Sequence, residues 1–176
     1  RPYPVVDGRI HETYAKASSA TLTNKLYDSY VRFFRWAVDR LGDRNGIVCL
    51  VTNNSFIDQI AFDSMRKHLM KDFTQIYHLD LHGNVRKNPK LSGTTHNIFG
   101  IQVGVGITIA VRSSHHATPI LNYYRVPEYW TRMEKLKFLA SKSDITGIEW
   151  LELHPDERHT WLTEGLYSEF RDFLPM

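Results

Sequence analysis

A run of alternating side chains constrains this sequence more than any other feature. Its apolar positions are Phe99, Ile101, Val103, Val105, Ile107, Ile109 and Val111, with small or polar residues between them. A period of two places successive side chains on opposite faces of a β-strand. The glycines Gly100, Gly104 and Gly106 match neither the dinucleotide fingerprint nor the phosphate-loop spacing, so they indicate a bend or close packing within a strand. The sequence therefore predicts a long strand over Phe99–Val111.

A helix, a strand and a second helix are expected before that run. Apolar residues spaced by three and four predict a helix over Asn24–Leu41, which ends before Gly42. The short apolar segment Ile47–Val51 is rich in β-branched residues, as in strands covered on both faces, so we expect a central strand in which Cys49 is buried. Apolar spacing also predicts a helix over Ile57–Lys71. Together with the alternating run, these elements predict an α/β fold with a mixed sheet.

The other elements are predicted from shorter patterns. They are loops over Arg1–Thr23 and Leu81–Asn97, strands over Phe73–Leu81, Ile120–Val126 and Asp144–Leu153, and a helix over Glu128–Ala140. The loop over Leu81–Asn97 is long enough to suggest a function, because connections in compact domains are usually much shorter.

Composition narrows the class of protein. The 176 residues are 42% hydrophobic, which supports a folded domain with a real core. The single cysteine, Cys49, cannot form an internal disulfide, so we expect a reducing, cytoplasmic location. No apolar run reaches the roughly 20 residues that span a bilayer, so no membrane partner is expected. The net charge of +3 permits a polyanionic partner without requiring one.

Two polar segments are candidates for a ligand site. Asn53, Asn54 and Ser55 suit the cap of the helix that follows them, and they equally suit a ligand site, because open α/β sheets bind ligands at the carboxyl ends of strands. In the long loop, the cations Arg86, Lys87 and Lys90 suit the phosphates of DNA, and a solvated loop is the alternative.

Other kinds of chemistry find no support in the sequence. No pair of histidines has a metal-ligand spacing with further ligands nearby, so no metal site is expected. Ser55 lacks the glycine-framed turn that exposes a catalytic nucleophile, so nucleophilic catalysis is not expected either.

Four segments resemble one group of bacterial proteins. They are Leu26–Ala37, Gly46–Phe56, His78–Asn84 and His96–Val105, and they occur in the order that the group shows. The group consists of large restriction-modification enzymes whose central domain is an adenine-N6 DNA methyltransferase, including single-chain forms that carry nuclease and helicase-like parts. The resemblance extends from the start to about Arg112 and becomes looser beyond Pro127.

The resemblance implies a particular fold and domain arrangement. The chain would be the C-terminal part of a Rossmann-like methyltransferase sheet, in which the strands Phe73–Leu81 and Phe99–Val111 form an antiparallel pair, with a short α+β extension. Residues 1–115 would be the second half of the catalytic domain. Residues 116–176 would be the extension, leading toward a target recognition domain. Because the sequence opens at Arg1 without an initiator methionine, we also expect a piece of a longer polypeptide.

The resemblance also implies an activity for the parent enzyme, methyl transfer from S-adenosylmethionine to adenine N6 in double-stranded DNA. Neither the glycine motif that holds S-adenosylmethionine nor the Asn-Pro-Pro-Tyr motif that holds the flipped adenine occurs in this sequence. The second motif would fall a short distance before Arg1. We therefore expect the isolated chain to be inactive and to bind no S-adenosylmethionine, and the remainder of the methyltransferase domain to be its partner.

Residues for the target-base pocket follow from the same resemblance. They are Asn53, Asn54, Phe56, His96, Asn97 and Phe99. The first three would line the rim near the target base. Phe99 would face the extruded base, since flipped bases are often held between aromatic rings, or it would be an ordinary core phenylalanine.

Two other classes of protein remain as alternatives. A non-catalytic nucleic-acid-binding or interaction module would explain the basic loop and the missing motifs equally well. A fragment of a Rossmann oxidoreductase is less consistent with the sequence, because no dinucleotide fingerprint is present.

Overall fold

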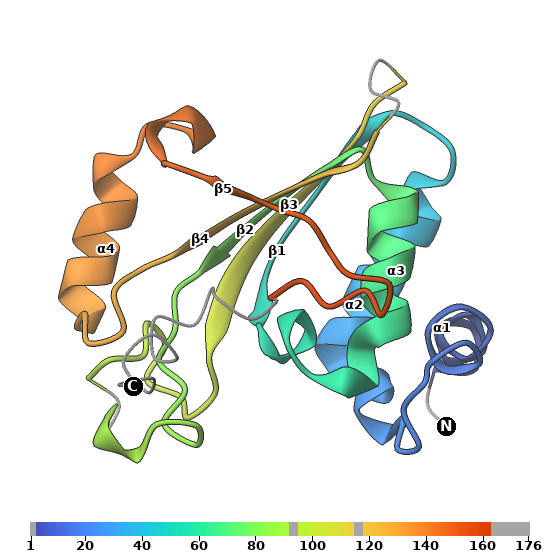
Figure 1. Cartoon of the computed structure of the whole chain (residues 1–176), viewed down its shortest axis with the longest axis horizontal. Helices are drawn as coiled ribbons and strands as arrows, with labels where there is room; N and C mark the ends of the chain where they lie inside the picture. The colour runs from blue at the N-terminus through green and yellow to red at the C-terminus, as the bar shows by residue number, and fades with distance from the viewer. Residues whose placement is uncertain (1–2, 92–94, 115–117, 163–176) are drawn as a thin grey trace, which may run out of the picture.

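The computed structural model describes residues 3–91, 95–114 and 118–162 (Figure 1). Its α-helices are α1 (Pro4–Ile10), α2 (Ser29–Leu41), α3 (Asp63–Asp72) and α4 (Arg132–Ser141). Its strands are β1 (Gly46–Asn53), β2 (Gln75–Asp80), β3 (Val105–Arg112), β4 (Ile120–Arg125) and β5 (Leu151–Leu153). Short 3₁₀ turns lie at Asn24–Tyr27, Ser55–Ile57, Ile60–Phe62, Pro89–Leu91 and Ile145–Gly147, and a π-helical turn follows α1 at His11–Ala15.

One mixed sheet organises the chain, with strand order β1-β3-β2-β4-β5. β3 runs antiparallel to both of its neighbours, β1 and β2. β2 and β4 are parallel, and β5 is antiparallel to β4. The predicted α/β fold, with a mixed sheet that contains an antiparallel pair, is therefore confirmed. It follows from these directions that β1, β2 and β4 point the same way, so their carboxyl ends share one edge of the sheet.

The two faces of the sheet carry different cores. The helices α1, α2 and α3 lie on one side of the sheet and α4 on the other (Figure 1). Toward α2 and α3, buried residues such as Phe34 and Met65 pack with Ile76 and Ala110 of the strands. On the other face, Phe138 of α4 stacks on a tyrosine of β4 and joins a smaller apolar cluster. The sheet therefore separates a larger core, toward α2 and α3, from a smaller one beneath α4.

The position of β1 differs from the prediction. β1 is an edge strand of the described sheet rather than its central strand, since it pairs with β3 alone. Val48 is buried against the helices, but Ile47 and Val51 are 65% and 52% exposed and Cys49 is exposed as well. The described residues cover only one face of this strand. The apolar run correctly indicated a strand, but it did not indicate what lies beside it.

The first residues form helix where a loop was predicted. α1 is short, and Pro4 occupies its first turn, where the missing amide hydrogen costs nothing. Arg32 of α2 donates to the buried Asp7 carboxylate across 2.7 Å, and Ile10 and Tyr14 are fully buried. Contacts with α2 and the core therefore hold this helix, and such contacts leave no long periodic pattern in the sequence.

The helix after β1 also begins later than predicted. The two 3₁₀ turns Ser55–Ile57 and Ile60–Phe62 come first, and α3 starts only at Asp63. The Asp63 carboxylate accepts hydrogen bonds from the side chains of Ser18 and Ser19 as well as from the Ser64 amide. This contact with the early loop fixes where the helix begins. The remaining predicted helix and strands are present with shifted bounds, and β5 covers only the last three residues of its predicted strand.

Candidate functional site

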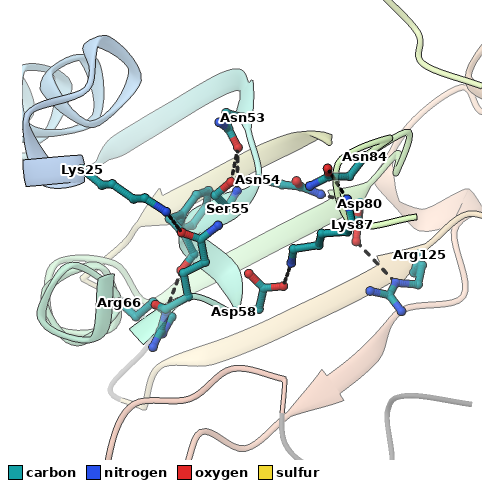
Figure 2. Close-up of polar contacts among 12 residues, drawn as sticks. Lys25, Asn53, Asn54, Ser55, Asp58, Arg66, Asp80, Asn84, Lys87 and Arg125 are labelled. Atoms are coloured by element: carbon teal, nitrogen blue, oxygen red, sulfur yellow. Dashed lines mark hydrogen bonds and ion pairs between the residues drawn. The ribbon is translucent and has the colours of Figure 1, made fainter. Parts of the chain in front are cut away.

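The shared carboxyl edge of β1, β2 and β4 holds a pocket of about 450 Å³. Asp58 lines it from the turn after β1, His82, Lys87 and Lys90 line it from the loop after β2, and Arg125 lines it from the end of β4. Open α/β sheets bind ligands at this edge because the loops that follow several strands meet there. The pocket and the polar contacts around it, many of which Figure 2 shows, form the candidate functional site.

Asp80, at the end of β2, is the centre of a buried polar network. Its carboxylate accepts hydrogen bonds from Asn54 Nδ2 at 2.5 Å, Tyr123 Oη at 3.0 Å and Arg125 Nε at 3.4 Å. The backbone amide of His82 donates to it as well, at 2.8 Å. Burial raises the pKa of Asp80, but the positive charges beside it and these donors outweigh burial, so the pKa lies below its ordinary value. The network therefore joins the ends of β1, β2 and β4 through an ionised carboxylate.

Asn54 links the end of β1 to the start of β3. Its backbone amide donates to the Gly104 carbonyl at 3.1 Å, and its side chain is nearly buried. A Cβ at Gly104 would lie 2.5 Å from Asn54 Oδ1, so this close approach requires glycine. Asn53 instead accepts hydrogen bonds from the amide and hydroxyl of Ser55, as expected of a residue that stabilises a turn.

Phe56 does not line a rim, contrary to the expectation from the resemblance. Its side chain is fully buried and packs edge-on against Phe34, His78 and Trp161. A base therefore has no access to it in the described structure. The resemblance located Phe56 in the turn after β1, but this turn directs its side chain into the core.

Asn97 and His96, two of the residues predicted for the base pocket, have different environments. Asn97 is fully buried, and its Nδ2 donates to the carbonyls of Gly83 and Val103 while its Oδ1 accepts from the amides of Phe99 and Ile101. His96 is half-buried, with Nδ1 3.3 Å from the Trp130 carbonyl oxygen.

Phe99 projects from this scaffold. It is 60% exposed, so the alternative that it is a core phenylalanine is wrong. The predicted strand over Phe99–Val111 begins only at Val105. Asn97 provides hydrogen-bond partners for the amides that follow it, and Gly100 adopts a positive φ of 70°, a backbone conformation that strands exclude. Phe99 therefore lies on a fixed, exposed loop.

The three predicted DNA-binding cations are all exposed on the loop after β2. Lys87 and Lys90 line the pocket, whereas Arg86 is not part of its lining. Asn84 Oδ1 accepts a hydrogen bond from the Lys87 amide, and Asn88 Oδ1 accepts one from the Lys90 amide. The backbone that carries the two lysines is therefore held in place by short polar side chains.

Sequence reasoning missed several residues of the site. His82 has a positive φ of 54° and is followed by Gly83 at 84°, so the chain turns sharply after β2. Such a backbone is costly for a residue with a Cβ and is concentrated at functional sites. Lys135 of α4 is fully buried and donates to the His96 carbonyl, and burial lowers its pKa to about 8. In the sequence, Gly83 was the signal for the sharp turn at His82. Nothing indicated Lys135, because it is far along the chain from the residues of the site.

Searches for two other kinds of feature gave negative results. Within residues 3–91, 95–114 and 118–162, no group of three or more His, Cys, Asp or Glu side chains is arranged to hold a metal ion. None of the helices in the same part of the chain has the length and apolar character needed to cross a membrane.

Comparison with known proteins identifies similar solved structures. The DrdV–DNA complex is 43% identical and superposes with a TM-score of 0.81 over 92% of this chain. A nuclease-deletion mutant of the Type ISP restriction-modification enzyme LlaGI, in complex with a DNA substrate mimic, is 34% identical, with a TM-score of 0.84 over 91% of this chain. The ATP-dependent Type ISP restriction-modification enzyme LlaBIII bound to DNA is 33% identical, with a TM-score of 0.83 over 91%.

The matches cover most of this chain but only a small share of each matched chain. This chain spans 16%, 15% and 11% of the three matched chains, respectively. No protein-family model matches the chain, and no curated protein matches it. Over nearly its whole length, the chain is therefore similar to one segment of restriction-modification enzymes.

Proposed function

We propose that this chain is the DNA-facing part of a restriction-modification enzyme region that transfers a methyl group from S-adenosylmethionine to adenine N6. The observation that carries the proposal is the 43% identity, over 92% of this chain, to a protein solved as a complex with DNA. The two further matches are restriction-modification enzymes with DNA or a DNA substrate mimic. Methyl transfer itself comes from the sequence resemblance to adenine-N6 methyltransferases.

Phe99 has the properties that a base-stacking residue needs. It is aromatic and 60% exposed, and Asn97 fixes the loop that carries it through four hydrogen bonds. Stacking of a nucleobase on such a ring stabilises binding by roughly 1–3 kcal/mol. In the proposed enzyme, Phe99 contacts one face of the extruded adenine, and His96 borders the same loop.

The charges at the sheet-edge pocket give no reason to assign S-adenosylmethionine to it. Lys87, Lys90 and Arg125 line this pocket together with the carboxylates of Asp58 and Glu128. Asp80 pairs with Arg125 behind the lining, so three cations meet three carboxylates and no excess negative charge favours a sulfonium cation there. We therefore assign the methyl donor to another part of the enzyme, and we assign DNA contacts to this chain.

The exposed ring provides the test. In the intact enzyme, Phe99→Ala should slow single-turnover methylation of duplex DNA by about tenfold or more, because stacking on the extruded base is lost. Phe99→Trp should restore most of the rate. Phe33→Ala is the matched control, since Phe33 of α2 is 61% exposed and lies in the helical layer.

Two outcomes would contradict the proposal in different ways. Normal methylation by the Phe99→Ala enzyme would remove Phe99 from the base site. DNA binding by the intact enzyme without any transfer of a labelled methyl group would instead favour the non-catalytic nucleic-acid-binding module.

A further inference from the structure

An ion pair crosses the pocket at the carboxyl edge. Lys87 Nζ, from the loop after β2, donates to Asp58 Oδ2, from the turn after β1. Figure 2 shows the two side chains pointing toward one another from these separate segments. The Lys87 side chain is 52% exposed and that of Asp58 is 16% exposed. The pair therefore connects two segments at the surface of the pocket, where a ligand has access to the ammonium group.

Neither segment depends on this pair for its position. Arg66 Nη1 donates to the carbonyls of Phe56 and Gln59 at 2.8 Å each, which anchors the turn on both sides of Asp58. On the other segment, Asn84 Oδ1 holds the Lys87 amide at 3.1 Å. Breaking the ion pair therefore leaves both backbones fixed, and only the lysine side chain has to move.

The carboxylate of this pair is only half satisfied. Asp58 Oδ1 is buried and has no hydrogen-bond partner among the described residues. Buried carboxylates that serve stability usually have partners for both oxygens. Asp58 therefore resembles a carboxylate that binds Lys87 until a ligand replaces it, rather than one whose ion pair stabilises the fold.

Two other cations, Lys90 and Arg125, line the pocket with Lys87. Of the carboxylates, Glu128 accepts a hydrogen bond from Asn88 Nδ2 at 2.6 Å, and Asp80 lies behind Arg125 with four donors around it. Asp58 is thus the carboxylate that competes directly with an incoming anion for Lys87.

We propose that this pocket holds one phosphate group of the DNA backbone, and that Lys87 exchanges Asp58 for that phosphate when DNA binds. The proposal rests on the proposed DNA-binding function and adds a specific contact and a competing residue. Phosphate oxygens accept charge-assisted hydrogen bonds from lysine and arginine, and the flexible lysine stem can turn between two acceptors. Asp58 therefore weakens DNA binding in proportion to the stability of its pair with Lys87.

Substitution of the two partners should have opposite effects on DNA affinity in the intact enzyme. Lys87→Ala should weaken binding and lower the magnitude of the salt slope by about 0.9, since one phosphate contact is lost. Asp58→Asn should tighten binding by about two- to fivefold, the value of an exposed ion pair, and should have no effect when Lys87 is already alanine. Lys67→Ala, at an exposed position on α3, is the control and should change neither quantity.

Whether Asp58→Asn tightens or weakens DNA binding distinguishes an exchanging ion pair from a structural one. Weaker DNA binding by both single variants, with a loss of thermal stability in each, would show that the pair is structural and would overturn the exchange. Because these assays measure DNA binding without methyl transfer, they succeed or fail independently of the Phe99 test.

A second measurement separates backbone phosphate from free phosphate. Replacing chloride by inorganic phosphate at constant ionic strength should weaken DNA binding to the unmodified enzyme, and should do so less in the Lys87→Ala variant. An equal effect on both proteins would mean that the pocket does not recognise phosphate.

Discussion

Charged residues in the helical layer and at the carboxyl edge are used differently. In the helical layer, Arg35 is 3% exposed, and its guanidinium lies 2.8 Å from Asp39 and 3.7 Å from Asp72. At the carboxyl edge, the lysines of the loop after β2 are exposed, and neutral asparagines hold the backbone. The comparison suggests that the buried charges stabilise the fold, whereas the exposed charges remain available for a ligand.

Removing a buried charge should have the largest effect on stability. Arg35→Ala should lower the free energy of unfolding by about 3 kcal/mol, because it leaves two carboxylates with fewer partners and removes a guanidinium packed over the Tyr14 ring. Denaturant unfolding monitored by circular dichroism measures this value. Arg40→Ala, at an exposed position of the same helix, should change it by less than about 0.5 kcal/mol. If both variants lower the free energy of unfolding by less than about 0.5 kcal/mol, the buried charges of the helical layer do not stabilise the fold.

A smaller loss is expected when the neutral scaffold of the edge is removed. Asn97→Ala should lower the free energy of unfolding by about 2 kcal/mol, since several buried backbone groups lose their partner. In the intact enzyme it should also slow methylation, because the loop that carries Phe99 is no longer fixed. Full activity in a measurably destabilised Asn97→Ala enzyme would show that Asn97 supports the fold alone.

The smallest of the three stability effects concerns the buried lysine of α4. The pKa of Lys135 is lowered by burial to about 8, below the ordinary lysine value of 10.5. Between these two pH values the unfolded chain binds more protons than the folded chain, so stability should rise with pH. The rise, in the difference between the unmodified protein and Lys135→Met, should be about 1–2 kcal/mol between pH 8 and 9.5. A difference that is constant over this range would show that the pKa is not lowered.

Much of the fold could be predicted because its signals are local. The alternation at Val105–Val111 and the apolar segment at Ile47–Val51 each indicate a strand, and both segments are strands in one sheet. The prediction failed where a single contact overrides the pattern. The alternation continues back to Phe99, yet the strand begins only at Val105. The side chain of Asn97 and the left-handed backbone of Gly100 hold the residues around Phe99 in a loop instead.

The candidate site was only partly predictable, for a related reason. Lys87 and Lys90 were recognised because they lie in a long basic loop. Asp58 and Arg125 were missed because they follow two other strands, β1 and β4, and approach this loop only when those strands align with β2. No pattern along the sequence records that alignment.

Within the described residues one edge of β1 is unpaired, and this bears on how the chain behaves on its own. An exposed strand edge offers amide and carbonyl groups to any other chain, and exposed apolar side chains such as Ile47 and Val51 strengthen that attraction. A preparation of the isolated chain is therefore expected to self-associate as its concentration rises. Solubility, rather than loss of the fold, then limits what can be measured on this chain alone, and pairing of β1 with a further strand would remove that limit.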